Sequence, residues 1–137
     1  MAESTAPPVR ITSFGYGHCR GGLRIPRAHL VLDLRTHFRD PHVAPELRHM
    51  TARDQEVRDA VLSTPGISEL VEATAAAVRA YQAGPTTELV TVAVGCTGGR
   101  HRAPTVALAV ARALRLAHDW QAVTVIDRDI ERSVIAR

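Results

Sequence analysis

The sequence predicts a single-domain α/β fold: a mixed or parallel four-stranded sheet with flanking helices, and a phosphate-binding loop between the third strand and its following helix. Short apolar runs alternate with stretches of helical periodicity, which is the order of strand–helix–strand units. Glycine-rich turns follow two of the apolar runs. With 137 residues, 45% of them hydrophobic, the chain can build one core, and it shows no internal repeat and no second domain.

The first strand is predicted at residues 9–14, where apolar and polar side chains alternate. Residues 1–8 have neither the basic nor the apolar region of a signal peptide, so we expect a disordered lead-in and a domain over residues 9–137. After the strand comes a glycine-rich turn that carries His18 and Arg20. This turn is either a mobile surface loop or a wall of a ligand pocket that contributes a cation.

The second strand is predicted at residues 29–35, which are mostly apolar. Asp33 and Arg35 stand two residues apart at its carboxyl end and therefore share a face. Ligands bind off the carboxyl ends of strands in open α/β sheets, so this pair is expected to face a pocket, with a structural ion pair as the alternative. Residues 36–50 hold three histidines and two arginines besides Asp40, and this density of polar groups predicts a long functional loop.

Two scaffold helices are predicted in the middle of the chain. Residues 51–54 have the Ser/Thr-x-x-acid pattern of a helix start, and this helix is expected to end near Ser63. Thr64-Pro65-Gly66 then interrupts the chain. Apolar residues recur at helical spacing from Ile67 to Tyr81, and Gly84-Pro85 ends this second helix.

The third strand and third helix enclose the most informative stretch of the chain. Residues 91–94 have the β-branched and small apolar side chains of a buried strand, and Pro104 suits the first position of a helix with one apolar face. The turn between them, called here the glycine turn, reads Gly95-Cys96-Thr97-Gly98-Gly99-Arg100-His101-Arg102. Unpaired backbone N–H groups and the helix dipole at such a turn form a site for a phosphate-like anion.

The fourth strand is predicted at residues 122–126 and leads into a charged turn that starts at Asp127. A right-handed parallel crossover from the third strand places this turn at the same edge of the sheet as the glycine turn. The exits of the four strands, near Phe14, Arg35, Gly95 and Asp127, thus bring charged or glycine-rich loops together. We expect a pocket where they meet.

Three interpretations of the glycine turn remain open. It binds an anion, it serves only as a turn, or it uses Cys96 as a nucleophile. The last follows from Cys96 and Arg102, which satisfy the Cys-x5-Arg pattern of cysteine-dependent phosphatases. Asp40 or Asp127 would then protonate the leaving group. Ala103 stands where those enzymes carry a hydroxyl group, so binding without catalysis is favoured over an enzyme.

Composition and spacing disfavour several classes of function. None of the 17 basic residues is lysine, so the nucleotide P-loop motif is absent and no ATPase activity is expected. The His and Cys residues match no zinc-ligand spacing, and no metal or other cofactor is expected. Two cysteines outside disulfide-type spacing, and no apolar run of about 20 residues, predict a cytoplasmic protein without a membrane span.

The glycine turn resembles the GCTGGxHRS motif of the C-terminal domain of the RapZ (YvcJ-like) family. The resemblance extends over nearly the whole chain from Val9 in these pieces: Ser13-Phe14-Gly15-Tyr16, Val31-Leu32-Asp33-Leu34-Arg35, Asp40-Pro41-His42, Pro45-Glu46-Leu47-Arg48, Met50-Thr51 with Asp54, and Arg128-Asp129-Ile130-Glu131. Proteins of that family also carry a P-loop half, which this sequence lacks, so the resemblance implies no ATP or GTP hydrolysis here.

By resemblance, the chain would be a metabolite sensor or regulatory adaptor that binds an amino-sugar phosphate such as glucosamine 6-phosphate. Regulatory RNA or a protein would be a further partner, and an oligomer is compatible with the sequence. RNA binding is less favoured than phosphate binding, because only Arg128, Arg132 and Arg137 remain of the family's basic tail. The predicted ligand-binding residues are Cys96, Thr97, Gly98, Gly99, Arg100, His101 and Arg102 of the turn, with Asp33, Arg35, His42, His18 and Arg20 around it.

Overall fold

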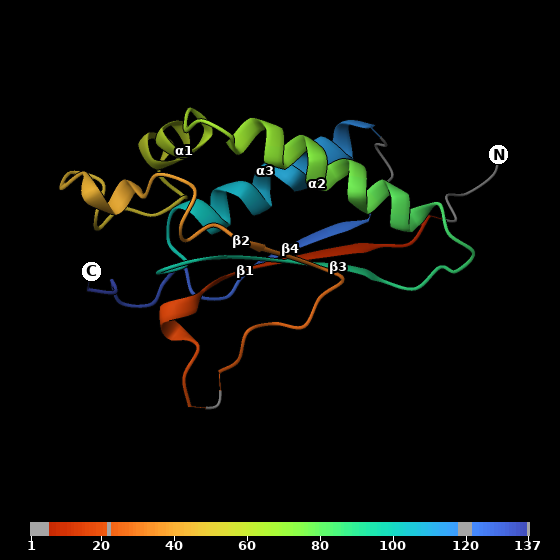
Figure 1. Cartoon of the computed structure of the whole chain (residues 1–137), viewed down its shortest axis with the longest axis horizontal. Helices are drawn as coiled ribbons and strands as arrows, with labels where there is room; N and C mark the ends of the chain where they lie inside the picture. The colour runs from red at the N-terminus through yellow and green to blue at the C-terminus, as the bar shows by residue number, and fades with distance from the viewer. Residues whose placement is uncertain (1–5, 22, 118–121, 137) are drawn as a thin grey trace.

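The computed structural model describes residues 6–21, 23–117 and 122–136, which form an α/β domain (Figure 1). The strands are β1 (Val9–Gly15), β2 (Leu30–Asp33), β3 (Val90–Cys96) and β4 (Val123–Asp127). The helices are α1 (Gln55–Leu62), α2 (Ile67–Gln82) and α3 (Arg102–Ala117), with short 3-10 helices η1 (Tyr16–His18) and η2 (Pro41–Val43).

The four strands of the sheet run parallel in the order β2-β3-β1-β4. This confirms the predicted α/β class and four-stranded sheet. At the carboxyl edge, Gly15 of β1 is in register with Cys96 of β3, and Ser13 of β1 with Asp127 of β4. All four strand exits therefore lie along one edge, as the sequence predicts.

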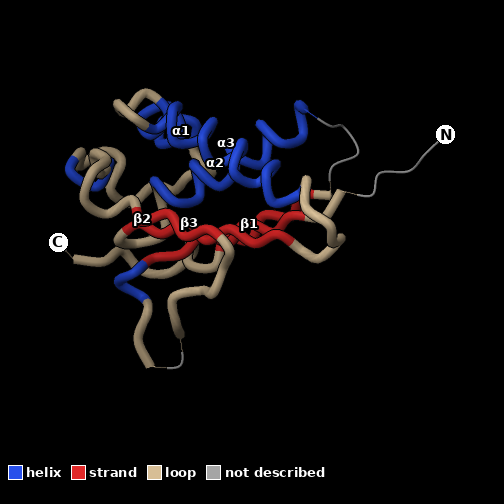
Figure 2. Tube along the Cα trace, turned by 45° about the vertical axis from the view of Figure 1, so that its right-hand side comes forward, coloured by secondary structure: helices blue, strands red, loops and turns tan. Residues whose placement is uncertain are grey.

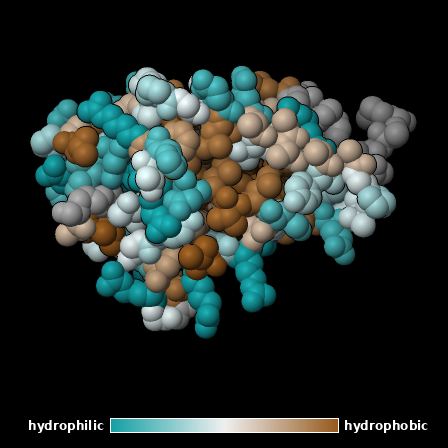
Figure 3. All heavy atoms as spheres, in the orientation of Figure 1, coloured by the Kyte–Doolittle hydropathy of each residue, from teal (hydrophilic) through white to brown (hydrophobic). Residues whose placement is uncertain are grey.

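The helices form a layer over one face of the sheet (Figures 1 and 2). Helix α3 lies at the centre of the layer, against β1, β3 and β4 below and the other two helices beside it. Figure 3 shows hydrophobic residues gathered at the middle of one side of the molecule, with hydrophilic residues around them. Among the described residues, no helix is long and apolar enough to cross a membrane.

Helices α1 and α3 do not begin at the residues that the sequence predicts. Helix α1 begins at Gln55 rather than Thr51, because the Ala52 N–H donates to the carbonyl of Arg100 and the Asp54 carboxylate accepts from the Thr51 N–H. These bonds hold residues 51–54 as a turn. Helix α3 begins at Arg102, two residues before Pro104, so Arg102 belongs to the helix rather than to the turn.

Part of the predicted lead-in is ordered against the domain. The carbonyl of Pro7 accepts a hydrogen bond from Nε2 of Gln82, and that of Pro8 accepts one from the Val90 N–H. Residues 1–5 lie outside the described part of the chain.

A buried carboxylate joins the exits of β1 and β4. Asp129 is fully buried and accepts hydrogen bonds from the Gly15 N–H at 2.8 Å, from Arg128 at 2.9 Å and from Arg132 at 2.7 Å. Burial alone would raise the pKa of Asp129, but these hydrogen bonds bring the pKa below its ordinary value. The charged form is therefore part of the folded structure.

We expect Asp129→Asn to lower the free energy of unfolding by about 3 kcal/mol at pH 7, since it leaves two arginines short of a charged partner. The folded pKa lies below the unfolded one, so the stabilisation is complete above about pH 4 and is lost as the pH falls through the folded value. Urea unfolding at several pH values should show this acid dependence in the parent chain and a shallower one in the variant. Asp59→Asn, on the exposed side of α1, is the control and should change stability by less than about 0.5 kcal/mol. An Asp129→Asn variant as stable as this control would contradict the assignment.

Candidate anion-binding site

The glycine turn connects the buried end of β3 to the first turn of α3. Gly98 and Gly99 are both buried, and Gly99 has a φ of 73°, a left-handed conformation that favours glycine. The chain reverses within these few residues, and α3 points its N-terminus at the carboxyl edge of the sheet. Its partial positive charge therefore lies at the convergence of the strand exits.

Three backbone N–H groups of the glycine turn are unsatisfied within the described part of the chain. Those of Gly98, Arg100 and His101 have no hydrogen-bond acceptor among the described residues. All three residues line a small pocket at the carboxyl edge. Buried donors without partners are costly, and an anion would satisfy them.

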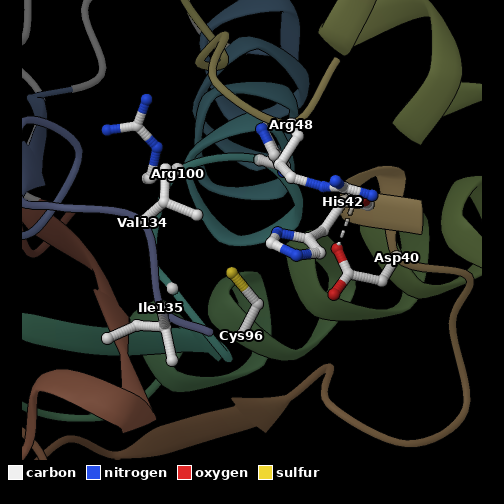
Figure 4. A pocket seen from close by; sticks show the side chains of 9 residues that line it. Asp40, His42, Arg48, Cys96, Arg100, Val134 and Ile135 are labelled. Carbon is white, nitrogen blue, oxygen red and sulfur yellow. Dashed lines mark hydrogen bonds between the residues drawn. The ribbon is translucent and has the colours of Figure 1, made fainter. Parts of the chain in front are cut away.

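Cys96 lies at the base of the same pocket. Its Sγ accepts the N–H of Gly99 at 3.3 Å and the N–H of Ala103 at 3.4 Å, and its exposed fraction is 2%. In Figure 4 the sulfur points into the space below the His42 ring. Two amide N–H groups at a helix N-terminus thus point at the sulfur, an arrangement that suits either an anion receptor or a nucleophile.

Arg102 holds neighbouring loops rather than lining the pocket. The side chain is 2% exposed, and its Nη1 donates to the carbonyls of Leu34 at 2.8 Å, Phe38 at 2.9 Å and Arg35 at 3.3 Å. Its Nη2 lies 3.3 Å from the Asp40 carboxylate. The guanidinium thus holds the loop after β2 against the glycine turn.

Arg100 holds two other segments against the glycine turn, residues 130–132 and residues 49–50. Its Nη1 donates to the carbonyl of Arg132 at 2.8 Å and that of Ile130 at 3.4 Å. Its Nη2 donates to the carbonyl of His49 at 2.7 Å and that of Met50 at 3.5 Å. The two arginines of the turn are therefore engaged mainly with backbone carbonyls.

The pocket above the turn combines two arginines, a carboxylate and two histidines (Figure 4). It is lined by Asp40, His42, Arg48, Cys96, Gly98, Arg100, His101, Val134 and Ile135. Arg48 uses its Nε to bond the carbonyl of His42 at 3.0 Å, and its two terminal NH2 groups have no partner among the described residues. Arg48 therefore has two NH2 groups to offer a ligand, and the buried Nε of Arg100 is a further donor without a partner among the described residues.

The two histidines of the pocket are held in different ways, His101 through its ring and His42 through its backbone. His101 is 4% exposed, and its Nε2 lies 2.8 Å from the carbonyl of Met50, which assigns the proton to Nε2. Burial lowers the pKa of His101, so the ring is neutral at pH 7. The N–H of His42 donates to Asp40 at 3.0 Å, which sets the start of η2. In the described ranges, no group of three or more His, Cys, Asp or Glu side chains is arranged to hold a metal ion.

Several predicted site residues lie outside this pocket. Asp33 and Arg35 form an exposed ion pair at 2.8 Å, with the Arg35 guanidinium 3.6 Å above the Tyr16 ring. Arg20 is exposed and bonds the carbonyl of Gly17. Asp127 accepts the Ser13 hydroxyl at 2.7 Å. His18 lies on η1 and Thr97 accepts a hydrogen bond from Arg102, so neither lines the pocket.

Three residues that line the pocket were not predicted from the sequence. Arg48 stands in the polar stretch 36–50, whose density of charge was the available signal, but nothing in that stretch singles it out. Val134 and Ile135 carry no signal of a binding role, because two apolar residues in an irregular segment are typical of any surface turn.

The sequence of this chain matches the model of a known protein family. The family model of the RapZ C-terminal domain matches residues 7–131. The chain belongs to this family. The match confirms the resemblance drawn from the glycine turn and supports a regulatory binding domain.

The chain is also similar to parts of longer proteins. A nucleotide-binding protein of Thermobifida fusca is 40% identical over 134 residues, which cover 96% of this chain and 43% of the relative. One of Frankia alni is 42% identical, covering 89% of this chain and 41% of the relative. One of Streptomyces coelicolor is 40% identical, covering 96% and 44%. The chain thus spans less than half the length of these relatives.

Proposed function

We propose that the chain binds a small phosphorylated metabolite at the glycine turn, without transforming it, as a regulatory domain. The observation that carries the proposal is the set of N–H groups of Gly98, Arg100 and His101, which have no acceptor among the described residues and belong to residues that line one pocket. The N-terminus of α3 adds partial positive charge at the same place.

The charges around the turn fit a phosphate ester. Arg48 supplies a guanidinium with two NH2 groups for bidentate contact with phosphate oxygens. Asp40 supplies a carboxylate on the same pocket wall, which suits an ammonium or hydroxyl group of the ligand. This pairing favours an amino-sugar phosphate such as glucosamine 6-phosphate, the ligand that the family resemblance implies.

Phosphorus NMR of glucosamine 6-phosphate with the purified chain tests binding and turnover together. We expect a shifted or broadened ester resonance and no inorganic phosphate over several hours. An unchanged spectrum would rule out this sugar phosphate. Growth of an inorganic phosphate signal would replace the binding proposal with an enzymatic one.

Removing the charge of Arg48 should weaken binding. We expect Arg48→Gln to lower the affinity for glucosamine 6-phosphate about tenfold, because a charge-assisted contact to the phosphate is lost. Titration calorimetry measures the change. Arg112→Gln removes the same charge from an exposed position on α3 and should leave affinity unaltered. Equal affinities in both variants would remove Arg48 from the site.

A cysteine-dependent phosphatase is the second candidate, favoured by the two amide N–H groups on the Cys96 sulfur and by Asp40 in the same pocket. The position of Arg102 disfavours it, because the guanidinium that would hold the phosphoryl oxygens is bonded to three carbonyls. Cys96→Ser distinguishes the two candidates: it would abolish turnover in a phosphatase and barely change binding in a receptor.

A polyanionic partner is a separate proposal, supported by three exposed arginines, Arg20, Arg24 and Arg27, between η1 and β2. If RNA contacts this surface through its phosphates, its retention should fall steeply as the salt concentration rises. Binding that is absent, or insensitive to salt, would exclude RNA.

A further inference from the structure

His101 is a buried histidine in the wall of the anion site. Its ring is 4% exposed, and its Nε2 donates to the carbonyl of Met50 at 2.8 Å. Its backbone N–H is one of the three donors of the glycine turn that have no acceptor among the described residues. The same residue thus brings to the site both an amide for an anion and a titratable ring.

The ring is neutral although several of its neighbours favour a charged ring. Burial has the largest influence and lowers the pKa of His101. The carbonyls of Met50 and Leu47 and the carboxylate of Asp40 act in the other direction and raise this pKa. The guanidinium of Arg100 lowers it. The neutral ring therefore already lies beside groups that would stabilise an imidazolium.

Other charged and titratable side chains line the pocket together with His101. They come from residues 40–48 and from the glycine turn, while Gly98, Val134 and Ile135 carry no charge. Arg102, at the start of α3, lies 3.3 Å from the Asp40 carboxylate and offsets its charge. A bound anion would thus be the main new negative charge near the ring. The charged and titratable groups of the pocket are Asp40, His42, Arg48, Cys96 and Arg100.

A phosphate group at the turn would change the balance that keeps the ring neutral. A phosphate ester carries about two negative charges at pH 7. Two opposite unit charges about 7 Å apart, in the partly buried surroundings of a protein, attract each other enough to favour protonation about fiftyfold. A proton that enters at Nδ1 leaves the hydrogen bond from Nε2 to Met50 in place. The ring can therefore become charged without leaving its position.

We propose that His101 takes up a proton when a phosphate group binds the glycine turn, so that the affinity rises as the pH falls. The inference rests on the proposed function and adds its regulation. Between the pKa of the free ring and the higher pKa of the ring beside the ligand, each fall of one pH unit strengthens binding up to about tenfold. Below the first pKa the ring is charged in both states, and above the second it is neutral in both, so the ring does not affect affinity there.

The first test compares affinities at two pH values. Titration calorimetry gives the ratio of the affinity for glucosamine 6-phosphate at about pH 6 to that at about pH 8, for the parent chain and for His101→Gln. The glutamine amide can still donate to the Met50 carbonyl. The ligand's own titration is the same for both chains and cancels in the comparison. We expect the ratio to be about tenfold larger in the parent chain. His37→Gln, which removes an exposed histidine, is the control and should keep the ratio of the parent chain.

The second test needs no substitution. Nitrogen chemical shifts of the His101 ring in the labelled parent chain at pH 7 report its protonation directly. We expect a proton on Nε2 alone in the free chain, and protons on both ring nitrogens at saturating glucosamine 6-phosphate.

Three results would overturn the inference while leaving the proposed function in place. They are a ring that stays neutral in the complex, a ratio that His101→Gln leaves unchanged, and a ratio that is lost in His42→Gln alone, which would assign the proton to the other histidine of the pocket. If glucosamine 6-phosphate binds to none of these chains at either pH, the proposed function fails for this ligand and the inference fails with it.

Discussion

Arg102→Ala should cost about 3–5 kcal/mol of the free energy of unfolding, as expected when a buried charge pair loses one partner. The side chain is 2% exposed, and its removal takes a donor from the carbonyls of Leu34 and Phe38 and a cation from the carboxylate of Asp40. Urea unfolding measures the change. Arg102→Lys should lose less, but still more than 1 kcal/mol, because an ammonium cannot bond all these acceptors in the plane of a guanidinium.

The matched control for this prediction is Arg53→Ala. Arg53 pairs with Glu131 at 2.7 Å on the surface, where 61% and 77% of the two side chains are exposed, so its loss should cost at most about 1 kcal/mol. A small effect at Arg102 would mean that its carbonyl contacts are dispensable. It would also reopen the interpretation in which this arginine turns into the pocket to hold the phosphate.

Gly99→Ala should both destabilise the chain and abolish phosphate binding. A Cβ atom at Gly99 would lie 2.7 Å from the backbone N of Gly15 and 2.9 Å from the carbonyl carbon of Phe14, so the glycine turn and the exit of β1 would have to separate. The φ of 73° adds strain for any other residue. We expect a loss of about 3 kcal/mol in unfolding free energy, from strain and steric overlap together, and at least a hundredfold loss of affinity.

Gly21→Ala separates the two causes. Gly21 has a φ of 63°, but no atom of the described residues beyond its chain neighbours lies within 4 Å of a Cβ atom there, so this variant carries the conformational strain without the steric overlap. Its cost should be about 1 kcal/mol, with affinity unchanged. If Gly99→Ala proves no worse than this control by calorimetry and urea unfolding, close packing of the glycine turn is not what shapes the site.

The fold could be predicted from the sequence because local patterns carry it. The apolar runs that became β1, β3 and β4 are short and bounded by glycines or charges, and the parallel crossover then places their exits at one edge. The predicted start of α1 was wrong. The Ala52 N–H donates to the carbonyl of Arg100, which is distant in sequence, so residues 51–54 alone could not indicate this contact.

The site could be predicted only in part. The glycine turn and His42 were predicted as site residues. A sequence motif shows which side chains are present, but it does not show where they point. Arg102 lies in the helix rather than the turn, and its guanidinium reaches carbonyls of the loop after β2, some 64 to 68 residues away in sequence. Arg48, whose two NH2 groups have no partner among the described residues, has no periodic pattern around it.

The central claim is that backbone amides of the glycine turn receive a phosphate group. The most direct test is a nitrogen–proton correlation spectrum of the labelled chain, titrated with glucosamine 6-phosphate. We predict that the amide resonances of Gly98, Arg100 and His101 move progressively downfield and saturate together, while those of exposed α2 residues such as Glu72 stay in place. Amides of the turn that do not move at saturating ligand, or shifts confined to another surface, would contradict the claim.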